Sequence, residues 1–196
     1  GMNGGLVGGR YDGVNEHGVF IGLHKVMTDR ASHFEAGVPY HLIPRLVLDL
    51  CSSTAEAVAL IQQTPHLASF NYTIADKHGD FARCECYPNL PVAVLRSADV
   101  MATTNHFDDA RLAATMGRRP TADSRAREAS LRSAVTHEHG DPWVQTAQAM
   151  SDHATPLCCH KEFGTTLWSG LFDLTLDRVA YSFGAPCSVA YREYSL

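Results

Sequence analysis

The hydrophobic positions of this chain change their spacing several times, and each spacing predicts an element. Residues 19–26 form an almost continuous apolar run, which is typical of a buried strand. Within residues 38–51, leucines recur at helical spacing from Leu42 to Leu50, although Pro44 interrupts the pattern. We therefore expect a buried strand and then a helix in the first part of the chain.

A second helix is predicted immediately afterwards by its start signal. Ser53 and Glu56 have the spacing of a capping box, in which the serine oxygen accepts an early backbone N–H and the glutamate returns the bond. Leu60 and Ile61 then lie on one apolar face, and Pro65 ends the helix.

The middle of the chain changes to strand-like patterns. Residues 70–75 and 81–87 flank residues 76–80, whose composition is typical of a turn, so we expect a hairpin. Further strands are predicted over residues 92–95 and 100–104. This part of the chain is therefore predicted to be antiparallel sheet.

The last third is predicted to pass from helix back to strand. Helices are expected over residues 123–135 and 142–152, the second with Asp141 as its N-cap. Residues 165–174 and 179–183 predict two closing antiparallel strands. Strands, then helices, then strands again predict an α+β fold with antiparallel sheet.

Composition and charge narrow the class of protein. A 45% hydrophobic and 19% charged composition over 196 residues is typical of a globular protein, so we expect residues 1–196 to form a single domain. Residues 1–18 are a glycine-rich leading segment without periodicity. The net charge of −5, without a basic block, argues against a nucleic-acid partner. No apolar run approaches the ~20 residues of a membrane helix, and no signal peptide is visible. We therefore expect a cytoplasmic protein without a membrane partner.

Six cysteines are spread along the chain, and their spacing suggests no disulfide framework. We expect reduced thiols, in agreement with a cytoplasmic location. Cys84 and Cys86 alternate with Glu85, so both thiols are predicted to lie on one face of a strand. Cys51, at the end of a leucine-rich helix, suits core packing.

Clustered histidines and cysteines raise the question of a metal site. The pairs His137/His139 and Cys158/His160 match neither zinc-finger spacing nor the His-Glu-x-x-His helix, so we expect no metal ligands and no cofactor. The glycine pairs within residues 4–9 precede no lysine–serine pair, which argues against a phosphate-binding loop. Cys158 and His160 remain the best internal candidates for a thiol beside a base.

A series of short motifs follows one known order along nearly the whole chain. Residues 12–18, followed by an apolar strand that ends Gly22-Leu-His24, resemble a signature of the choloylglycine hydrolase, penicillin acylase and acyl-CoA:6-aminopenicillanic acid acyltransferase families. Further segments resemble these families in their order: residues 53–58, 75–79, 84–85, 103–107, 123–125 and 181–186. Each motif alone is modest, and their shared order makes the resemblance specific.

The resemblance implies both a fold and a chemistry. The fold is the four-layer αββα sandwich of N-terminal nucleophile hydrolases, with two stacked antiparallel sheets between helices. The activity is hydrolysis of linear amide C–N bonds, or acyl transfer, through a cysteine thioester on a small-molecule substrate and without a cofactor. The nucleophile in these families is an N-terminal cysteine freed by processing, because its own α-amino group, with a reference pKa near ~8, acts as the base for the thiol.

Three residues correspond to site positions of these families. Asn105 matches the asparagine whose side chain donates to the oxyanion, a bond typically worth ~3 kcal/mol in the transition state. His24 matches, with a one-residue gap, the position whose backbone N–H is the second donor. Arg125 matches an arginine that supports the charge of the nucleophile. Each also has a plain structural interpretation: a turn-capping asparagine, a core histidine and a solvated helical arginine beside Arg127.

The beginning of the family pattern is not matched. No cysteine precedes Cys51, and Arg10 and Asp12 adjoin the later motif instead of the segment that follows the nucleophile. We therefore expect an N-terminally truncated, inactive chain: either a longer active enzyme begins upstream, or this is a naturally shortened binding or structural homologue. Loss of a strand would uncover a sheet edge, so we expect a homo-oligomer or poor solubility.

Overall fold

The computed structural model describes residues 1–2, 8–29, 35–117, 121–135, 140–154, 157–161 and 164–195. The chain divides into two compact units, Gly1–Thr121 and Ala122–Leu196, and each is described by itself. The expectation of a single domain over residues 1–196 stays a prediction.

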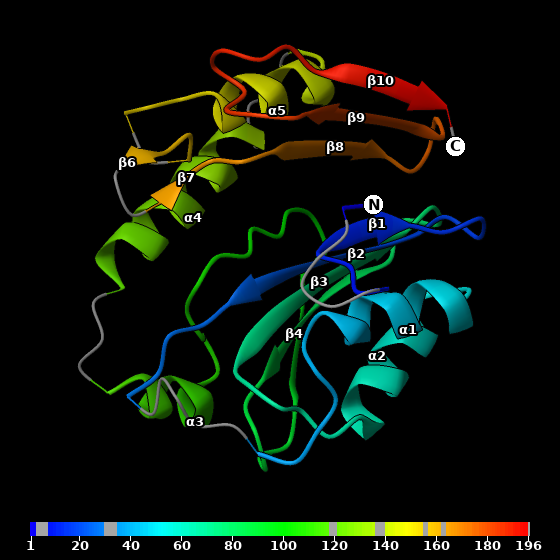
Figure 1. Cartoon of the computed structure of the whole chain (residues 1–196), viewed down its shortest axis with the longest axis vertical. Helices are drawn as coiled ribbons and strands as arrows, with labels where there is room; N and C mark the ends of the chain where they lie inside the picture. Colours follow the sequence, from blue (N-terminus) through cyan, green and yellow to red (C-terminus); the bar gives the residue numbers. More distant parts are fainter. Residues whose placement is uncertain are drawn as a thin grey trace. The chain divides into compact units, whose positions relative to one another are not determined.

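The first unit is built on a five-stranded antiparallel sheet in which every strand pairs with the next one along the chain. Its strands are β1 (Asp12–Val14), β2 (Val19–Lys25), β3 (Phe70–Asp76), β4 (Phe81–Cys86) and β5 (Ala93–Arg96). Two helices, α1 (Leu42–Leu50) and α2 (Thr54–Gln63), cover one face of this sheet (Figure 1). The predicted strand over residues 19–26, the central hairpin and both helices are therefore confirmed.

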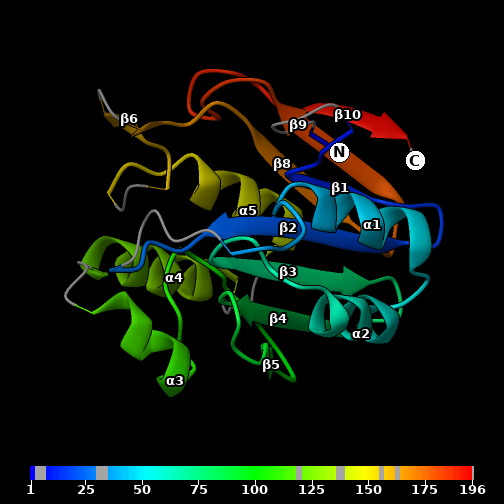
Figure 2. The ribbon, with the colours of Figure 1, turned by 60° about the horizontal axis from the view of Figure 1, so that its bottom comes forward.

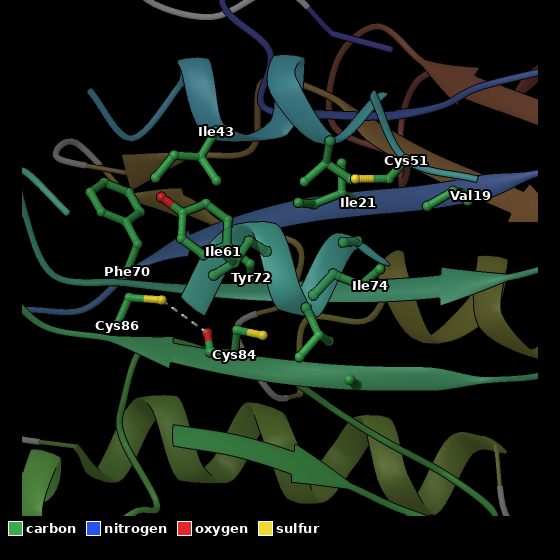
Figure 3. Packing of buried hydrophobic residues seen from close by; sticks show 14 residues of the cluster. Val19, Ile21, Ile43, Cys51, Ile61, Phe70, Tyr72, Ile74, Cys84 and Cys86 are labelled. Atoms are coloured by element: carbon green, nitrogen blue, oxygen red, sulfur yellow. Dashed lines mark hydrogen bonds between the residues drawn. The ribbon is translucent and has the colours of Figure 1, made fainter. Parts of the chain in front are cut away.

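The core of the first unit lies between the two helices and the sheet. Ile21, Tyr72 and Cys84 point to this face from successive strands, and Ile61 reaches it from α2 (Figure 3). Alternation along β4 places Cys86 on the same face as Cys84, as predicted. Burial of these side chains holds the helices on the sheet.

Helix α1 differs from the prediction in two respects. Pro44 is its third residue and lies in the first turn, where backbone N–H groups have no intrahelical partner, so the proline does not interrupt the helix. The buried face comprises Ile43, Pro44 and Val47, whereas Leu50 is 65% exposed. The leucine repeat therefore predicted the helix correctly, although its leucines do not form the buried face.

Helix α2 begins at the predicted cap. The Ser53 hydroxyl accepts a hydrogen bond from the Glu56 N–H at 3.2 Å. The Glu56 carboxylate accepts its return bond from the N–H of Ser52 at 2.7 Å, one residue earlier than in a standard capping box. The helix ends before Pro65, as expected.

Residues 100–104 do not form the predicted strand. Instead they lead into an irregular segment that ends at α3 (Ala110–Ala113), which the 3-10 turn η1 (Ala114–Met116) follows. Asp109 caps α3 by accepting hydrogen bonds from the N–H groups of Arg111 and Leu112. Residues 102–104 are nevertheless buried, which explains why their apolar pattern resembled a strand.

The second unit contains a helix pair and a separate sheet. Helix α4 (Ala122–Val135) contacts α5 (Pro142–Met150), and Asp141 caps α5 as predicted. A three-stranded antiparallel sheet has the order β10 (Arg192–Ser195), β9 (Arg178–Ser182), β8 (Ser169–Asp173), as Figure 2 shows. In addition, β6 (His160–Lys161) pairs with β7 (Gly164–Thr165). The closing pair β8 and β9 was predicted; β10 was not.

Helix α5 packs on the sheet of this unit through β8. The Arg178 guanidinium lies 3.8 Å from the ring centroid of Trp143, which joins β9 to α5 by a cation–π contact. Among the residues that the structure describes, no helix is long and apolar enough to cross a membrane.

Candidate active site

The segment that carries Asn105 is held on the sheet face opposite the helices. Asn71 of β3 is fully buried, and its side-chain amide donates to the carbonyls of Thr104 at 3.1 Å and His106 at 2.8 Å. Because Asn71 and Tyr72 are neighbours on a strand, their side chains point to opposite faces. Tyr72 faces the helices, so residues 104–106 lie on the other face.

Asn105 is itself attached to the end of β2. Its Nδ2 donates to the backbone carbonyl of Lys25 at 2.8 Å, and its side chain is partly exposed. This bond uses one of the two N–H groups of the amide and fixes the direction of the whole group. The structure therefore brings Asn105 next to the strand end that carries His24.

The backbone of His24 points toward the neighbouring strand. The Leu23 N–H bonds to the Tyr11 carbonyl on the β1 side, and the Val26 N–H bonds to the Ser69 carbonyl on the β3 side. Because N–H directions alternate along a strand, the His24 N–H is directed toward β3, whereas Lys25 directs its N–H and its carbonyl to the side where Asn105 lies. The role predicted for His24 stays a prediction, and the geometry makes Lys25 the residue beside Asn105.

The His24 side chain lies on the same sheet face as Asn71 and is partly buried. Its Nε2 lies 3.4 Å from the Thr73 hydroxyl oxygen. Arg125, the third predicted residue, has an exposed side chain on α4 of the second unit. Its neighbour Arg127 forms an ion pair with Asp123 at 3.1 Å, one helical turn away. The structure thus brings two of the three predicted positions together within the first unit.

A buried charged network supports this face of the sheet. The Glu85 carboxylate accepts the Asp108 N–H at 2.9 Å and the Asp109 N–H at 2.9 Å, and Arg83 lies 3.2 Å from it. Arg83 also forms an ion pair with Asp108, whose carboxylate lies 3.3 Å from His106 Nε2. Burial raises the pKa of the Glu85 carboxyl group, while the two N–H donors and the Arg83 charge act against this shift.

This network was not predicted, although a signal for it exists. Arg83 and Glu85 alternate with Cys84 and Cys86 along β4, so the strand has one apolar and one charged face. Because the network holds the backbone of residues 108–109, it fixes the segment that follows Asn105.

The thiols of the first unit lie away from Asn105. Cys84 and Cys86 point to the helix-covered face, and Cys51 packs into the same core. Burial raises the pKa of Cys84 to about 12 and also raises the pKa values of Cys86 and Cys51. Thiols in this environment are protonated near neutral pH and are poor nucleophiles.

The remaining thiols belong to the second unit. His160 Nε2 lies 3.1 Å from the Cys187 sulfur and 3.5 Å from the Cys158 sulfur. The candidate thiol and base, Cys158 and His160, therefore lie close together, and Cys187 is an additional neighbour that spacing along the sequence does not reveal. Burial raises the pKa of the Cys158 thiol.

One comparison bears directly on the order of motifs along the chain. The sequence profile of the acyl-coenzyme A:6-aminopenicillanic acid acyl-transferase family matches residues 1–187. The chain belongs to this family. The resemblance inferred from the motifs is therefore confirmed, and the match extends over both units of this chain.

Two solved structures show which fold this chain shares. Penicillin V acylase from Agrobacterium tumefaciens matches with a TM-score of 0.62 and 16% identity, over 94% of this chain and 65% of that one. A mutant of the conjugated bile acid hydrolase from Clostridium perfringens matches with a TM-score of 0.55 and 10% identity, over 96% of this chain and 77% of that one. These likenesses show an α+β fold of the N-terminal nucleophile hydrolase type, as predicted. No curated protein matches the sequence.

Proposed function

We propose that this chain provides the oxyanion-stabilising part of a site for cysteine-dependent amide hydrolysis or acyl transfer. Membership of the acyl-transferase family supports this class of reaction. The observation that carries the proposal is the bond from Asn105 Nδ2 to the Lys25 carbonyl, which holds a side-chain amide at a strand end. The chain spans 65% of the length of the penicillin V acylase that it resembles. The complete reaction, from attack on the substrate to release of the product, is therefore also proposed.

The proposed reaction needs hydrogen-bond donors at the substrate oxygen on which negative charge develops. A thiolate attacks the carbonyl carbon of an amide or thioester, and the carbonyl oxygen becomes an oxyanion. Asn105 donates to this oxygen, and a backbone N–H at the end of β2 is the second donor: the resemblance implies that of His24, and the strand geometry favours that of Lys25. Collapse of the intermediate breaks the bond to the amine or thiol, which leaves, and the acyl group stays on the cysteine as a thioester. Water or an amine then attacks the thioester, takes the acyl group and releases the cysteine thiol. Each such donor is typically worth ~3 kcal/mol in the transition state.

We propose further that the 196 residues are inactive by themselves. Cys51, Cys84 and Cys86 are packed in the core, and burial raises all three pKa values. Among the described thiols, Cys187 has the best geometry for a nucleophile, because it is exposed and lies 3.1 Å from His160. The alternative to this proposal is therefore that the chain is active, with Cys187 as its nucleophile.

An assay on the purified chain separates the two. The substrates are penicillin V, a conjugated bile acid, and an acyl-CoA with 6-aminopenicillanic acid. We expect no release of acid and no acyl transfer above the rate without protein. Turnover that disappears in Cys187→Ser and persists in the neighbouring variant Cys159→Ser contradicts the inactivity and favours the alternative.

A binding experiment tests the oxyanion role without needing turnover. The acid released from penicillin V carries a carboxylate whose oxygens resemble the oxyanion. We expect the chain to bind this acid, and Asn105→Ala to weaken the binding about 10-fold or more, since a bond to a charged group is worth about 1.5–3 kcal/mol. Gln62→Ala removes an exposed amide from α2 and is the matched control. The affinities are measured by calorimetry. If Asn105→Ala and Gln62→Ala bind the acid equally well, Asn105 is not an oxyanion donor.

A cytoplasmic location also stays a proposal. All six cysteines are unpaired, which supports a reducing compartment. Fractionation of the producing cells, followed by detection of the chain with an antibody, tests it.

A further inference from the structure

Four metal-binding side chains converge in the second unit, apart from the residues assigned above. They come from three segments: His153 follows α5, Cys158 precedes β6 and His160 is the first residue of β6, and Cys187 lies in the turn after β9. One donor atom from each residue lies within 4.8 Å of all the others. All four residues are within Ala122–Leu196, so the cluster belongs to one unit.

One of the two nitrogen–sulfur distances and the spacing of the two imidazole rings match those around a tetrahedral metal ion, and the other nitrogen–sulfur distance is shorter. With Zn–S of about 2.3 Å and Zn–N of about 2.0–2.1 Å, a sulfur and a nitrogen on one zinc ion lie about 3.6 Å apart. The His160 nitrogen lies 3.5 Å from one sulfur and 3.1 Å from the other. The rings of His153 and His160 have centroids 5.1 Å apart and are nearly perpendicular, at 78°. Two imidazoles on one tetrahedral ion have centroids about 5 Å apart.

A single hydrogen bond at His160 does not account for both of its sulfur contacts. The same atom, His160 Nε2, approaches the sulfurs of both Cys158 and Cys187. A ring nitrogen of a neutral imidazole offers either one proton or one lone pair, so it forms a good hydrogen bond to one of the two thiols. A cation at the centre satisfies the nitrogen lone pairs and both sulfurs together.

The backbone positions the ligands independently of a metal. The Cys159 N–H bonds to the Thr166 hydroxyl at 3.0 Å, and the Thr166 N–H returns to the Cys159 carbonyl at 2.8 Å. On the other side, the N–H groups of Ser188 and Val189 both bond to the Ala185 carbonyl and close the turn that carries Cys187. The ligand-bearing segments are therefore ordered by their own hydrogen bonds.

We propose that His153, Cys158, His160 and Cys187 bind one zinc ion in a tetrahedral site of two thiolates and two imidazoles. This donor set suits zinc among the common divalent cations. Four protein ligands fill the tetrahedron and leave no position for a substrate, so the role is structural. The ion joins the turn after β9 to the segment that enters β6.

This proposal replaces the expectation of no metal site. Cys158 and His160 by themselves match no known zinc spacing, because the other two ligands lie elsewhere along the chain. His137 and His139, the other pair considered, lie outside the described residues.

Metal analysis of the full chain tests the proposal. The chain is purified with a reductant, and its zinc content is measured by mass spectrometry of the metal. We expect one zinc per chain, and Co²⁺ in its place should give the visible absorption of a tetrahedral ion with a thiolate-to-cobalt band. Cys187→Ser and His160→Gln should weaken zinc binding more than about 100-fold, since losing a residue that merely orients a ligand costs about 10- to 100-fold. Cys159→Ser, an adjacent cysteine outside the cluster, should bind zinc like the parent chain.

Three outcomes overturn the proposal. The first is a chain that binds neither zinc nor cobalt, and the second is Cys187→Ser with the affinity of the parent chain. The third is a Cys158–Cys187 disulfide in chain purified without chelator, detected by mass spectrometry of unreduced peptides. Cys187 is exposed, so its serine variant should keep the circular dichroism of the parent chain. If the circular dichroism of Cys187→Ser differs from that of the parent chain, His160→Gln serves as the second ligand variant.

Discussion

At the residue scale, Asp76 joins the central hairpin to helix α2. Its carboxylate is buried and accepts hydrogen bonds from the N–H groups of Thr54 at 2.9 Å, His78 at 3.0 Å and Asp80 at 3.4 Å. Burial alone raises its pKa, but the hydrogen bonds from these residues outweigh burial and leave the pKa below its ordinary value. Thr54 is the first residue of α2, so the charge also lies at the positive end of the helix dipole.

Asp76→Asn should destabilise the protein in a pH-dependent way. Because the folded-state pKa lies below the unfolded value of about 3.9, the carboxylate stabilises the fold above that pH, and its contribution is lost as the pH falls through the folded-state pKa. At pH 7 we expect a loss of about 1–3 kcal/mol in the free energy of unfolding, because an amide nitrogen then faces N–H donors. Urea unfolding measures it, with the exposed Asp99→Asn as control. A loss that is equal at pH 7 and pH 3 refutes the role of the charge.

At the scale of elements, local signals predicted the helices and strands well where each element forms from its own sequence. The Ser53 cap, the Asp141 cap and the turn after Asp76 depend on residues a few positions apart, so the sequence contains them whole. The failure at residues 100–104 has a different cause. The carbonyl of Thr104 is bonded by the Asn71 side chain, which lies about thirty positions away in sequence and takes the place of a partner strand there.

In the candidate site, too, the sequence predicted what depends on neighbouring residues and did not predict contacts between distant segments. Asn105 could be found because it belongs to a motif of neighbouring residues. The bond to Lys25 links positions 105 and 25, and the His153 and Cys187 ligands come from separate segments, so spacing could not reveal either. Strand direction decides which backbone N–H faces Asn105, and the motif does not specify it.

Ser53→Ala tests the cap of α2. The Ser53 hydroxyl accepts the Glu56 N–H, and its removal leaves that group without a side-chain partner. We expect a loss of about 0.5–2 kcal/mol in the free energy of unfolding. Chemical denaturation is the measurement, and Ser97→Ala, an exposed serine outside the helices, is the control. A change equal to that of the control contradicts the capping role.

At the scale of the whole molecule, exposed sheet edges favour association. In the three-stranded sheet, β10 is an outer strand, and all four of its residues are exposed. Tyr194 of this strand is 42% exposed, and Phe183 beside it is 57% exposed. A strand edge next to exposed aromatic rings is a template for pairing with a second copy.

We therefore predict a homo-oligomer that forms through β10. Light scattering coupled to size exclusion should show a mass above the monomer at high concentration. Tyr194→Lys should shift the chain toward monomer, because lysine on an outer strand opposes edge pairing. Val144→Lys, which places the same charge on an exposed position of α5, should not. A monomer at every concentration argues against the prediction.

The division of the five-stranded sheet into an apolar and a charged face also affects how this protein can change over time. Residues that face the helices, such as Ile74, need only fill space, and cores accept apolar replacements of similar volume. Asn71 and Glu85 on the other face each hold distant backbone, and few other side chains have the shape and donors to replace them. Substitutions on the helix-covered face should therefore disturb the fold least, whereas replacing Asn71 or Glu85 should disturb the segment that carries Asn105.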